Sequence, residues 1–412
     1  MVGVSGRGFD HLTLPNGLRL LGEHSAARSV AVGLAFDVGA RDEGADEAGA
    51  AHFLEHLAFK GDRGRRADDV NRAFDELGAR VNAYTSHDRT LFYGTALHDL
   101  RAPLMAQLLT LARPALRRED VDVERRVVLE EIAMAEDRPE DRAWERGARR
   151  FFAGHPLGAP VLGTRASLAA LGSARLRSFH RRWYRSDRAL LVVTGAYAWA
   201  DVVDQARAAT EGWTPGGAQR AHPAWAPRRG AAEERGSGFE RTHLVWFAPA
   251  PSAQDPARIA AALLARVVGD DDNGRLFWAL VEPGLVDDAA LWFDPADGAG
   301  SFQAAATTDD ASVDRVVETA DGVLARFERE GPTDDEWARA QRALATDVTL
   351  AAETPMGRLA ELSDAWLDRG EADTAAETVA RILATPPTAG RELLEGGPFS
   401  AGFRYALRPD AG

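Results

Sequence analysis

The predicted order of strands and helices occurs twice along the chain, and this repeat restricts the possible folds most strongly. Residues 1–213 begin with two short strands around the turn Pro15–Gly17 and continue with helices, further strands and long helices. The order strand, helix, helix, strand, long helices begins again after residue 238. The intervening residues 214–238 are rich in Gly, Pro and Arg and predict a linker. Because 412 residues exceed the ~250–300 of one core, we expect two α+β domains, 1–213 and 239–412.

The composition excludes several classes of protein and of site. The net charge of −14, from 63 acidic and 49 basic residues, argues against a nucleic-acid partner. The sequence has no cysteine, so a metal ion must be held by His, Asp or Glu. Its apolar segments are shorter than the ~20 residues of a membrane helix, and the N-terminal residues lack a secretory pattern. We therefore expect a cytoplasmic protein without a membrane contact.

Residues 50–61, AAHFLEHLAFKG, predict a helix with an unusual polar group. His52 and His56 are four residues apart and Glu55 lies between them, so all three side chains share one helical face. A surface cluster is the simplest alternative. The neighbouring Phe53 and Leu54 argue against a freely solvated face.

The spacing His-x-x-Glu-His suits a zinc-dependent hydrolase. Two neutral imidazoles one turn apart can bind Zn²⁺, and the carboxylate of Glu55 can take a proton from the activated water as general base. A catalytic zinc site needs a third protein ligand and one open position. Candidates lie in residues 124–131, ERRVVLEE, where two adjacent glutamates are available.

Further stretches make the sequence similar to a known family. HFLEHLAFKG, VNAYTSHDRT, VVLEEIAMAEDRPED, HPLGAPVLGT and FHRRWYRSDRALLVVTG resemble bacterial members of the pitrilysin and mitochondrial processing peptidase family of inverted zincins. The resemblance is close over residues 9–212 and weaker over 241–350. It implies two tandem, similar α/β-sandwich domains, each a mixed, mainly antiparallel sheet packed with helices.

The resemblance also assigns the remaining metal-site residues. The family has a ligating glutamate about 75 residues after the second histidine and another functional glutamate seven residues earlier. These steps lead from His56 to Glu131 as third ligand and to Glu124 as a residue that orients the site or assists proton transfer. Glu130 is the competing ligand, although on a helix it points about 100° away from Glu131. For Glu124 the alternative is an ordinary surface charge.

Peptides or small unfolded proteins are the substrates that the resemblance implies. In this family an edge strand beside the metal binds the substrate as an additional strand, and VNAYTS occupies that position here. Asn82, Ala83 and Tyr84 are then nearest the scissile bond, and Phe53 of the metal helix is a further candidate contact. The alternative for Tyr84 is a core aromatic residue.

One departure from the family concerns its C-terminal domain, which normally carries an Arg and, seven residues later, a Tyr that stabilise the oxyanion. The corresponding positions here are Leu280 and Asp287, and the only tyrosine after residue 212 is Tyr405. We therefore predict a zinc-bearing subunit of a heterodimer whose homologous partner supplies the Arg/Tyr pair. A self-sufficient homodimeric peptidase and a non-catalytic core subunit are the alternatives.

Overall fold

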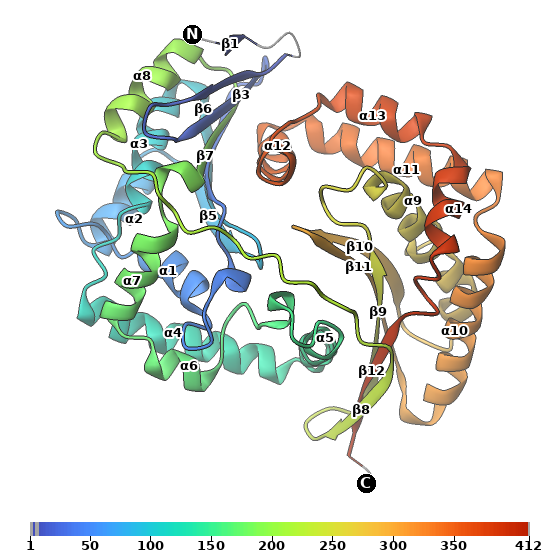
Figure 1. The fold of residues 1–412 in the computed structure, drawn as a ribbon. Coiled ribbons are helices and arrows are strands. Elements are labelled where there is room, and N and C mark those ends of the chain that lie inside the picture. The colour runs from blue at the N-terminus through green and yellow to red at the C-terminus, as the bar shows by residue number, and fades with distance from the viewer. Residues whose placement is uncertain (1–2, 5–7, 411–412) are drawn as a thin grey trace. The chain divides into compact units, whose positions relative to one another are not determined.

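A computed structural model describes residues 3–4 and 8–410, which form two compact units (Figure 1). Unit 1 contains the described residues up to Ile132 together with Ala159–Ala221 and Leu350–Ala375. Unit 2 contains Ala133–Gly158, His222–Thr349 and the described residues from Ala376 onward. None of the described helices is long and apolar enough to cross a membrane.

Unit 1 is built on a sheet with the strand order β1-β2-β3-β7-β4-β6-β5 among the described residues. Only β3 and β7 pair in parallel, and every other neighbouring pair is antiparallel. β5 is therefore an edge strand, which leaves one side of its backbone without a paired strand. The strands are β1 (Gly3–Val4), β2 (Asp10–Thr13), β3 (Arg19–His24), β4 (Ser29–Phe36), β5 (Arg80–Thr85), β6 (Thr90–Leu97) and β7 (Ala189–Gly195).

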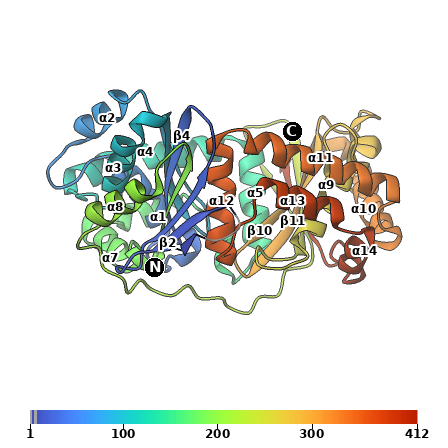
Figure 2. The ribbon, with the colours of Figure 1, turned by 90° about the horizontal axis from the view of Figure 1, so that it is seen from above.

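Helices cover both faces of this sheet because its strands are apolar on both sides. In β4, Val32 and Leu34 join the core beneath α1 and α3, while Ala31 and Ala35 pack with Leu359 of α12. Figure 2 shows α12 beside this sheet. The helices of unit 1 are α1 (Ala50–Ala58), α2 (Ala67–Asp75), α3 (Arg101–Leu111), α4 (Arg118–Asp137, continuing into unit 2), α6 (Arg165–Ala170), α7 (Ser173–Trp183), α8 (Trp199–Ala209) and α12 (Pro355–Arg369), with 3₁₀ turns at Ala40–Asp42, His98–Leu100 and Ser186–Arg188.

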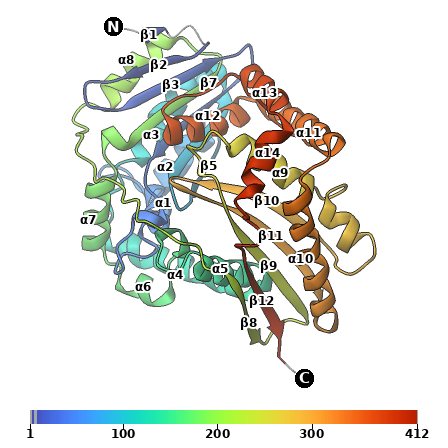
Figure 3. The ribbon, with the colours of Figure 1, turned by 45° about the vertical axis from the view of Figure 1, so that its right-hand side comes forward.

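Unit 2 has a sheet with the strand order β10-β11-β9-β12-β8, in which β12 and β8 form the parallel pair. Phe247 and Tyr405 pack against Phe151 of α5, which lies beside β9 in Figure 3. Trp246 and Phe302 join a second core with α9 and α10. The elements are α5 (Pro139–Phe151), β8 (Gly230–Gly236), β9 (Arg241–Ala250), α9 (Arg258–Gly269), β10 (Ala289–Ala296), β11 (Ala299–Asp309), α10 (Val313–Glu330), α11 (Asp334–Ala352), α13 (Ala375–Ala384), α14 (Pro387–Glu395) and β12 (Phe403–Pro409), with short helical turns at Pro156–Gly158, Phe277–Val281 and Asp310–Ser312.

The two sheets have equivalent topologies. The order β3-β7-β4-β6-β5 in unit 1 corresponds to β8-β12-β9-β11-β10 in unit 2, with the parallel pair in the same place. The predicted fold, two tandem and similar sandwiches with mainly antiparallel sheets, is confirmed.

The linear domain boundaries of the prediction do not describe how the chain is shared between the two units. α5 precedes the predicted linker but packs on β9 and β12, whereas α12 follows it and packs on β4 and β7. The boundaries 1–213 and 239–412 therefore stay a prediction of where each repeat of the element order begins and ends along the sequence. One part of the linker prediction needs correction, because Gly230–Gly236 form β8. The sequence GAAEERG lacks the apolar alternation that identifies a strand, since β8 is an edge strand with exposed side chains.

Candidate metal centre

The metal-binding helix predicted from the sequence is α1, and its apolar side chains fix its orientation. Phe53, Leu54 and Leu57 are fully buried in the core of unit 1, so the remaining face of α1 presents the two histidines. The side chain of Glu43 accepts hydrogen bonds from the N–H groups of Gly49 (2.7 Å), which immediately precedes α1, and of Ala51 (2.8 Å) in its first turn. The burial of Phe53 corrects its predicted role, because a side chain with 0% exposed surface cannot contact a substrate.

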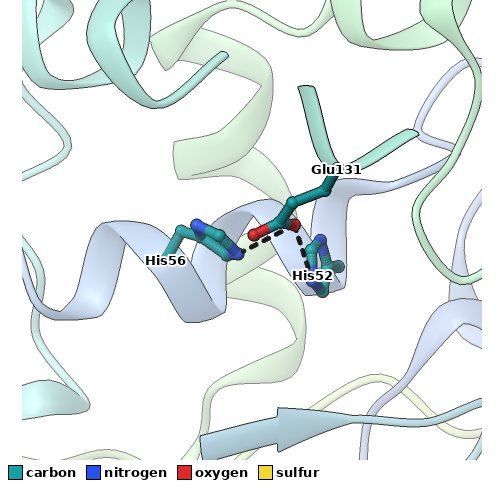
Figure 4. Close-up of side chains that lie close together, drawn as sticks. All are labelled: His52, His56 and Glu131. Carbon is teal, nitrogen blue, oxygen red and sulfur yellow. Dashed lines mark ion pairs between the residues drawn. The ribbon is translucent and has the colours of Figure 1, made fainter. Parts of the chain in front are cut away.

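His52, His56 and Glu131 come together as the sequence predicted (Figure 4). Oε2 of Glu131 lies 3.7 Å from Nε2 of His52 and 3.4 Å from Nε2 of His56. Zinc bonds of about 2.0–2.1 Å place tetrahedral ligand atoms about 3.3–3.4 Å apart, so Oε2 of Glu131 is near ligand spacing from both nitrogens. All three ligand atoms lie within 4.8 Å of one another. Glu130, the competing ligand, points outward and is exposed. The donor set therefore fits a zinc ion with one open coordination position.

The protonation of the two histidines follows from their surroundings. Burial and the neighbouring His56 lower the pKa of His52 to about 4, so this imidazole is neutral and able to bind a metal at pH 7. Burial also acts to lower the pKa of His56. The hydrogen bond to Glu124 and the charges of Glu131 and Glu55 outweigh burial, and the pKa of His56 is raised. Without a metal, His56 therefore takes up a proton more readily than His52 does.

Glu124 fixes the orientation of His56 by contacting Nδ1, the ring nitrogen that does not face Glu131. Its Oε2 lies 3.2 Å from Nδ1 of His56, and its Oε1 lies 2.5 Å from Nζ of Lys60. The Glu124 side chain is only 4% exposed. Burial acts to raise the pKa of Glu124, but the bonds to His56 and Lys60 lower it below its ordinary value, so the carboxylate is ionised. Such a partner on Nδ1 leaves Nε2 free for a metal.

Lys60 is a site residue that the sequence analysis missed, since it was treated only as the end of the helix. The signal was present: Lys60 is the only lysine among 412 residues, while all other basic side chains except histidine are arginine. It also continues the four-residue spacing of His52 and His56.

Glu55, the predicted general base, is held by a second residue that the sequence did not identify. Thr85, the last residue of β5, donates a hydrogen bond of 2.6 Å from Oγ1 to Oε2 of Glu55. Burial raises the pKa of Glu55, opposed by this hydrogen bond and by the charge of His56. The charges of His56 and Glu131 act on the pKa of Glu55 in opposite directions, and Glu55 is not one of the three residues of the cluster.

β5 brings the predicted peptide-contacting residues to the edge of the sheet. Its alternation directs Val81, Ala83 and Thr85 to the face that carries α1, while Asn82 and Tyr84 are on the other face. The N–H of Ala83 donates to Oδ1 of Asn82 (2.9 Å), a contact within one strand rather than to β6. Tyr84 is 37% exposed, so it is not a core residue, and its ring lies 6.5 Å from that of Tyr93.

The positions corresponding to the missing Arg/Tyr pair have other structural roles in unit 2. Leu280 is buried in the core, and Asp287 pairs with Arg241 at 2.9 Å. Tyr405 is buried and its hydroxyl is engaged by Glu234. The three side chains are thus accounted for by the packing and charge pairing of unit 2.

Comparison with protein families assigns both halves of the chain. A family model described as insulinase (peptidase family M16) matches residues 19–165, and a second, described as peptidase M16 inactive domain, matches residues 170–344. The first match contains His52, Glu55, His56, Glu124 and Glu131.

Curated relatives and solved structures agree with this assignment. A protein named uncharacterized zinc protease from Mycobacterium tuberculosis (strain H37Rv) is 35% identical over 90% of this chain and 86% of its own length. One of the same description from Streptomyces coelicolor is 33% identical over 91% and 84%. Among crystal structures, a protease from Helicobacter pylori (TM-score 0.88, 19% identity, 98% of this chain and 100% of that chain) has the same fold. An M16-like peptidase from Alicyclobacillus acidocaldarius (TM-score 0.87, 20% identity, 100% of both chains) shares it as well.

Proposed function

Because the chain belongs to peptidase family M16, we propose that it is a zinc-dependent endopeptidase subunit whose metal is held by His52, His56 and Glu131. The observation that carries this proposal is the convergence of two imidazole nitrogens and one carboxylate oxygen beside a separately held glutamate, Glu55. A subunit with only a scaffolding role does not need this combination.

The residues around the cluster have separate roles in amide hydrolysis. A bound zinc ion would acidify water and polarise the substrate carbonyl. Glu55 takes the proton from the attacking water and passes it to the leaving amine, while Thr85 keeps the carboxylate in position. Glu124 orients His56, and Lys60 balances the charge of Glu124.

The peptide substrate is proposed to bind along β5. An edge strand offers unpaired N–H and C=O groups, and pairing through the main chain tolerates many sequences. Ala83 is on the same face as Thr85, so a peptide paired with this part of β5 passes close to Glu55. Asn82 has to release the N–H of Ala83 before a peptide can accept a hydrogen bond from it.

The oxyanion-stabilising groups are proposed to come from a homologous partner subunit. Leu280 has no donor, and the carboxylate of Asp287 would repel an oxyanion. Loss of one oxyanion donor typically costs about 10²–10³ in rate, so the isolated chain is expected to be nearly inactive. The cytoplasmic location and the absence of a nucleic-acid partner stay predictions.

One experiment tests metal binding, then activity, and then the requirement for a partner subunit. The purified chain is dialysed, its zinc content is measured by mass spectrometry, and hydrolysis of a quenched fluorescent peptide is followed. The assay is repeated after addition of a homologous subunit that carries Arg and, seven residues later, Tyr. We expect bound zinc in both samples and hydrolysis only with the partner.

The variant Glu55→Gln is the control for the chemistry. It should keep its zinc and lose hydrolysis in the reconstituted pair by about 10²–10⁴. Normal activity of that variant would exclude Glu55 as base, and full activity of the isolated chain would favour the homodimeric alternative. A chain that retains no divalent metal would contradict the proposed function altogether.

A further inference from the structure

Unit 1 contains a cavity of about 730 Å³ that no step of peptide hydrolysis uses. It lies among α3, α7 and the end of α8, all labelled in Figure 1, and is also lined by the segments that follow α1 and α3. Its volume is within the ~300–1,000 Å³ typical of small-molecule sites. We name it the arginine cavity after its cationic lining residues, Arg63, Arg113, Arg177 and Arg181.

The charge of this cavity is opposite to that of the whole chain. Four arginines line it and Asp62 is its only acidic lining residue, although the protein has a net charge of −14. Asp62 is already engaged, because its Oδ2 pairs with Arg65 at 2.9 Å. Positive charge is thus concentrated in the arginine cavity beyond what the lining residues neutralise.

Two of the four arginines are held in place by backbone carbonyls, and all four keep N–H donors for a ligand. Arg177 donates to the carbonyl of Leu116 (2.7 Å), and Arg113 donates to that of Gly212 (3.0 Å). Each guanidinium has five N–H donors, so both keep donors for a ligand. Within the described part of the chain, the side chains of Arg63 and Arg181 form no hydrogen bond or ion pair.

Apart from Thr110, the remaining lining residues of the arginine cavity are apolar or aromatic. Leu109 and Leu116 are nearly completely buried, and Trp213 lies beneath the guanidinium of Arg113, 5.8 Å from its ring centroid. His180 donates from Nε2 to the carbonyl of Ala112 (2.9 Å). This imidazole contributes a flat surface rather than a further charge.

We propose that the arginine cavity binds a small amphipathic anion, a molecule with one carboxylate or phosphate group attached to an apolar body. The anionic group pairs with Arg63 and Arg181, since guanidinium groups bind carboxylate and phosphate oxygens through paired N–H donors. The apolar body covers Ala106, Pro114 and Ala115, the apolar lining residues that keep part of their surface exposed. An inorganic anion leaves this wall in water, and an uncharged molecule leaves the arginines without a partner.

A second cavity, of about 410 Å³ in unit 2, lacks this charge selectivity. Its Arg404 pairs with its Asp321 at 2.5 Å, and Nε1 of Trp246 donates to the same carboxylate. The charged groups of that cavity satisfy one another, whereas those of the arginine cavity do not.

Binding of octyl phosphate to the full chain, measured by titration calorimetry below its micellar concentration, tests the proposal. We expect one molecule per chain, with inorganic phosphate and octanol at least tenfold weaker. Octanoate in place of octyl phosphate distinguishes the two head groups, and binding of either compound supports the site. Equal affinity for inorganic phosphate, equal affinity for octanol, or no binding of either amphiphile would overturn it.

Two variants locate the binding site. The double variant Arg63→Gln/Arg181→Gln changes exposed side chains, so it should fold normally and bind at least tenfold more weakly. Arg118→Gln removes an arginine whose side chain is 91% exposed and does not line the cavity, and it should bind as the wild type does. Unchanged binding by the double variant, or equal weakening by Arg118→Gln, would contradict the assignment.

Discussion

Nδ1 of His56 lies 3.2 Å from Oε2 of Glu124, and the other oxygen of that carboxylate lies 2.5 Å from the ammonium of Lys60. The three side chains form a row behind the candidate metal site, in which a buried negative charge lies between an imidazole and a cation. An ionised carboxylate is costly to bury unless it is paired on both sides. The arrangement therefore stabilises the imidazole tautomer with its proton on Nδ1, which leaves Nε2 as the ligand atom.

This relationship predicts the effect of Glu124→Ala. The change removes the acceptor for Nδ1 of His56 and leaves Lys60 unpaired, so zinc affinity should fall by about 10–100-fold. Competition with a fluorescent chelator measures the affinity. Because Lys60 is the only lysine, amine-reactive labelling followed by peptide mass spectrometry reports on it directly, and its labelling should accelerate severalfold.

Glu119→Ala is the matched control for Glu124→Ala. Glu119 lies on the same helix, α4, with a 62% exposed side chain that pairs with Arg66. Its removal should change neither zinc affinity nor labelling of Lys60. A Glu124→Ala protein with wild-type zinc affinity would show that the carboxylate has no part in orienting His56.

The adjacent glutamates of α4 give a second prediction. Glu131→Ala removes one of three metal ligands, so zinc should be lost on dialysis, whereas Glu130→Ala should keep it because Glu130 is exposed and points away. Elemental analysis of both dialysed proteins measures the difference. The opposite pattern of retention would exchange the roles of the two residues.

The local part of this site could be predicted from the sequence, and the long-range part could not. The spacing of His52, Glu55 and His56 follows from helical geometry, so it is readable within one turn. Glu131 lies 75 residues later, and only the family resemblance linked it to the histidines. Thr85 was missed because alternation along β5 shows which residues share a face but not which face meets α1.

The same distinction applies to the fold. The repeated order of elements predicted two α+β domains, since strand and helix patterns are local properties of the chain, and the family resemblance added the similar sandwich architecture. α5 belongs to unit 2 although it precedes the predicted linker, and α12 belongs to unit 1 although it follows the linker. Which unit each helix joins depends on the apolar surface against which it packs. An amphipathic pattern shows that a helix buries one face, but Leu359 gives no indication that its partners are Ala31 and Ala35.

Thr85 leads to a third prediction. Thr85→Val preserves the shape of the side chain but removes the donor to Glu55, and a hydrogen bond to a charged group contributes about 1.5–3 kcal/mol. If that energy positions the base, kcat of the reconstituted pair should fall by about 10–100-fold while KM and zinc content stay unchanged. Thr85→Ser retains the hydroxyl and should restore most of the rate. A Val variant as active as the wild type, or a Ser variant as slow as Val, would indicate that the hydrogen bond does not position the base.

The fourth prediction concerns stability and pH. Burial, together with the nearby Arg113, lowers the pKa of His180 to about 4 against the hydrogen bond to Ala112, whereas an unfolded histidine has a pKa of about 6.5. The unfolded chain therefore binds a proton between these values while the folded chain does not. The contribution of His180 to stability is complete above pH ~6.5 and is lost as the pH falls toward 4, by about 2 kcal/mol between pH 7.5 and 5.

Urea unfolding at those two pH values measures this loss. His180→Gln keeps a donor for the carbonyl of Ala112 but has no titrating group, so its free energy of unfolding should fall by about 2 kcal/mol less than that of the wild type. His98→Gln, which removes an exposed imidazole, is the matched control and should follow the wild type. Equal pH dependence in all three proteins would mean that His180 is protonated to the same extent in the folded and unfolded chains, so that the wall of the arginine cavity would carry a fifth cation only below pH ~6.5.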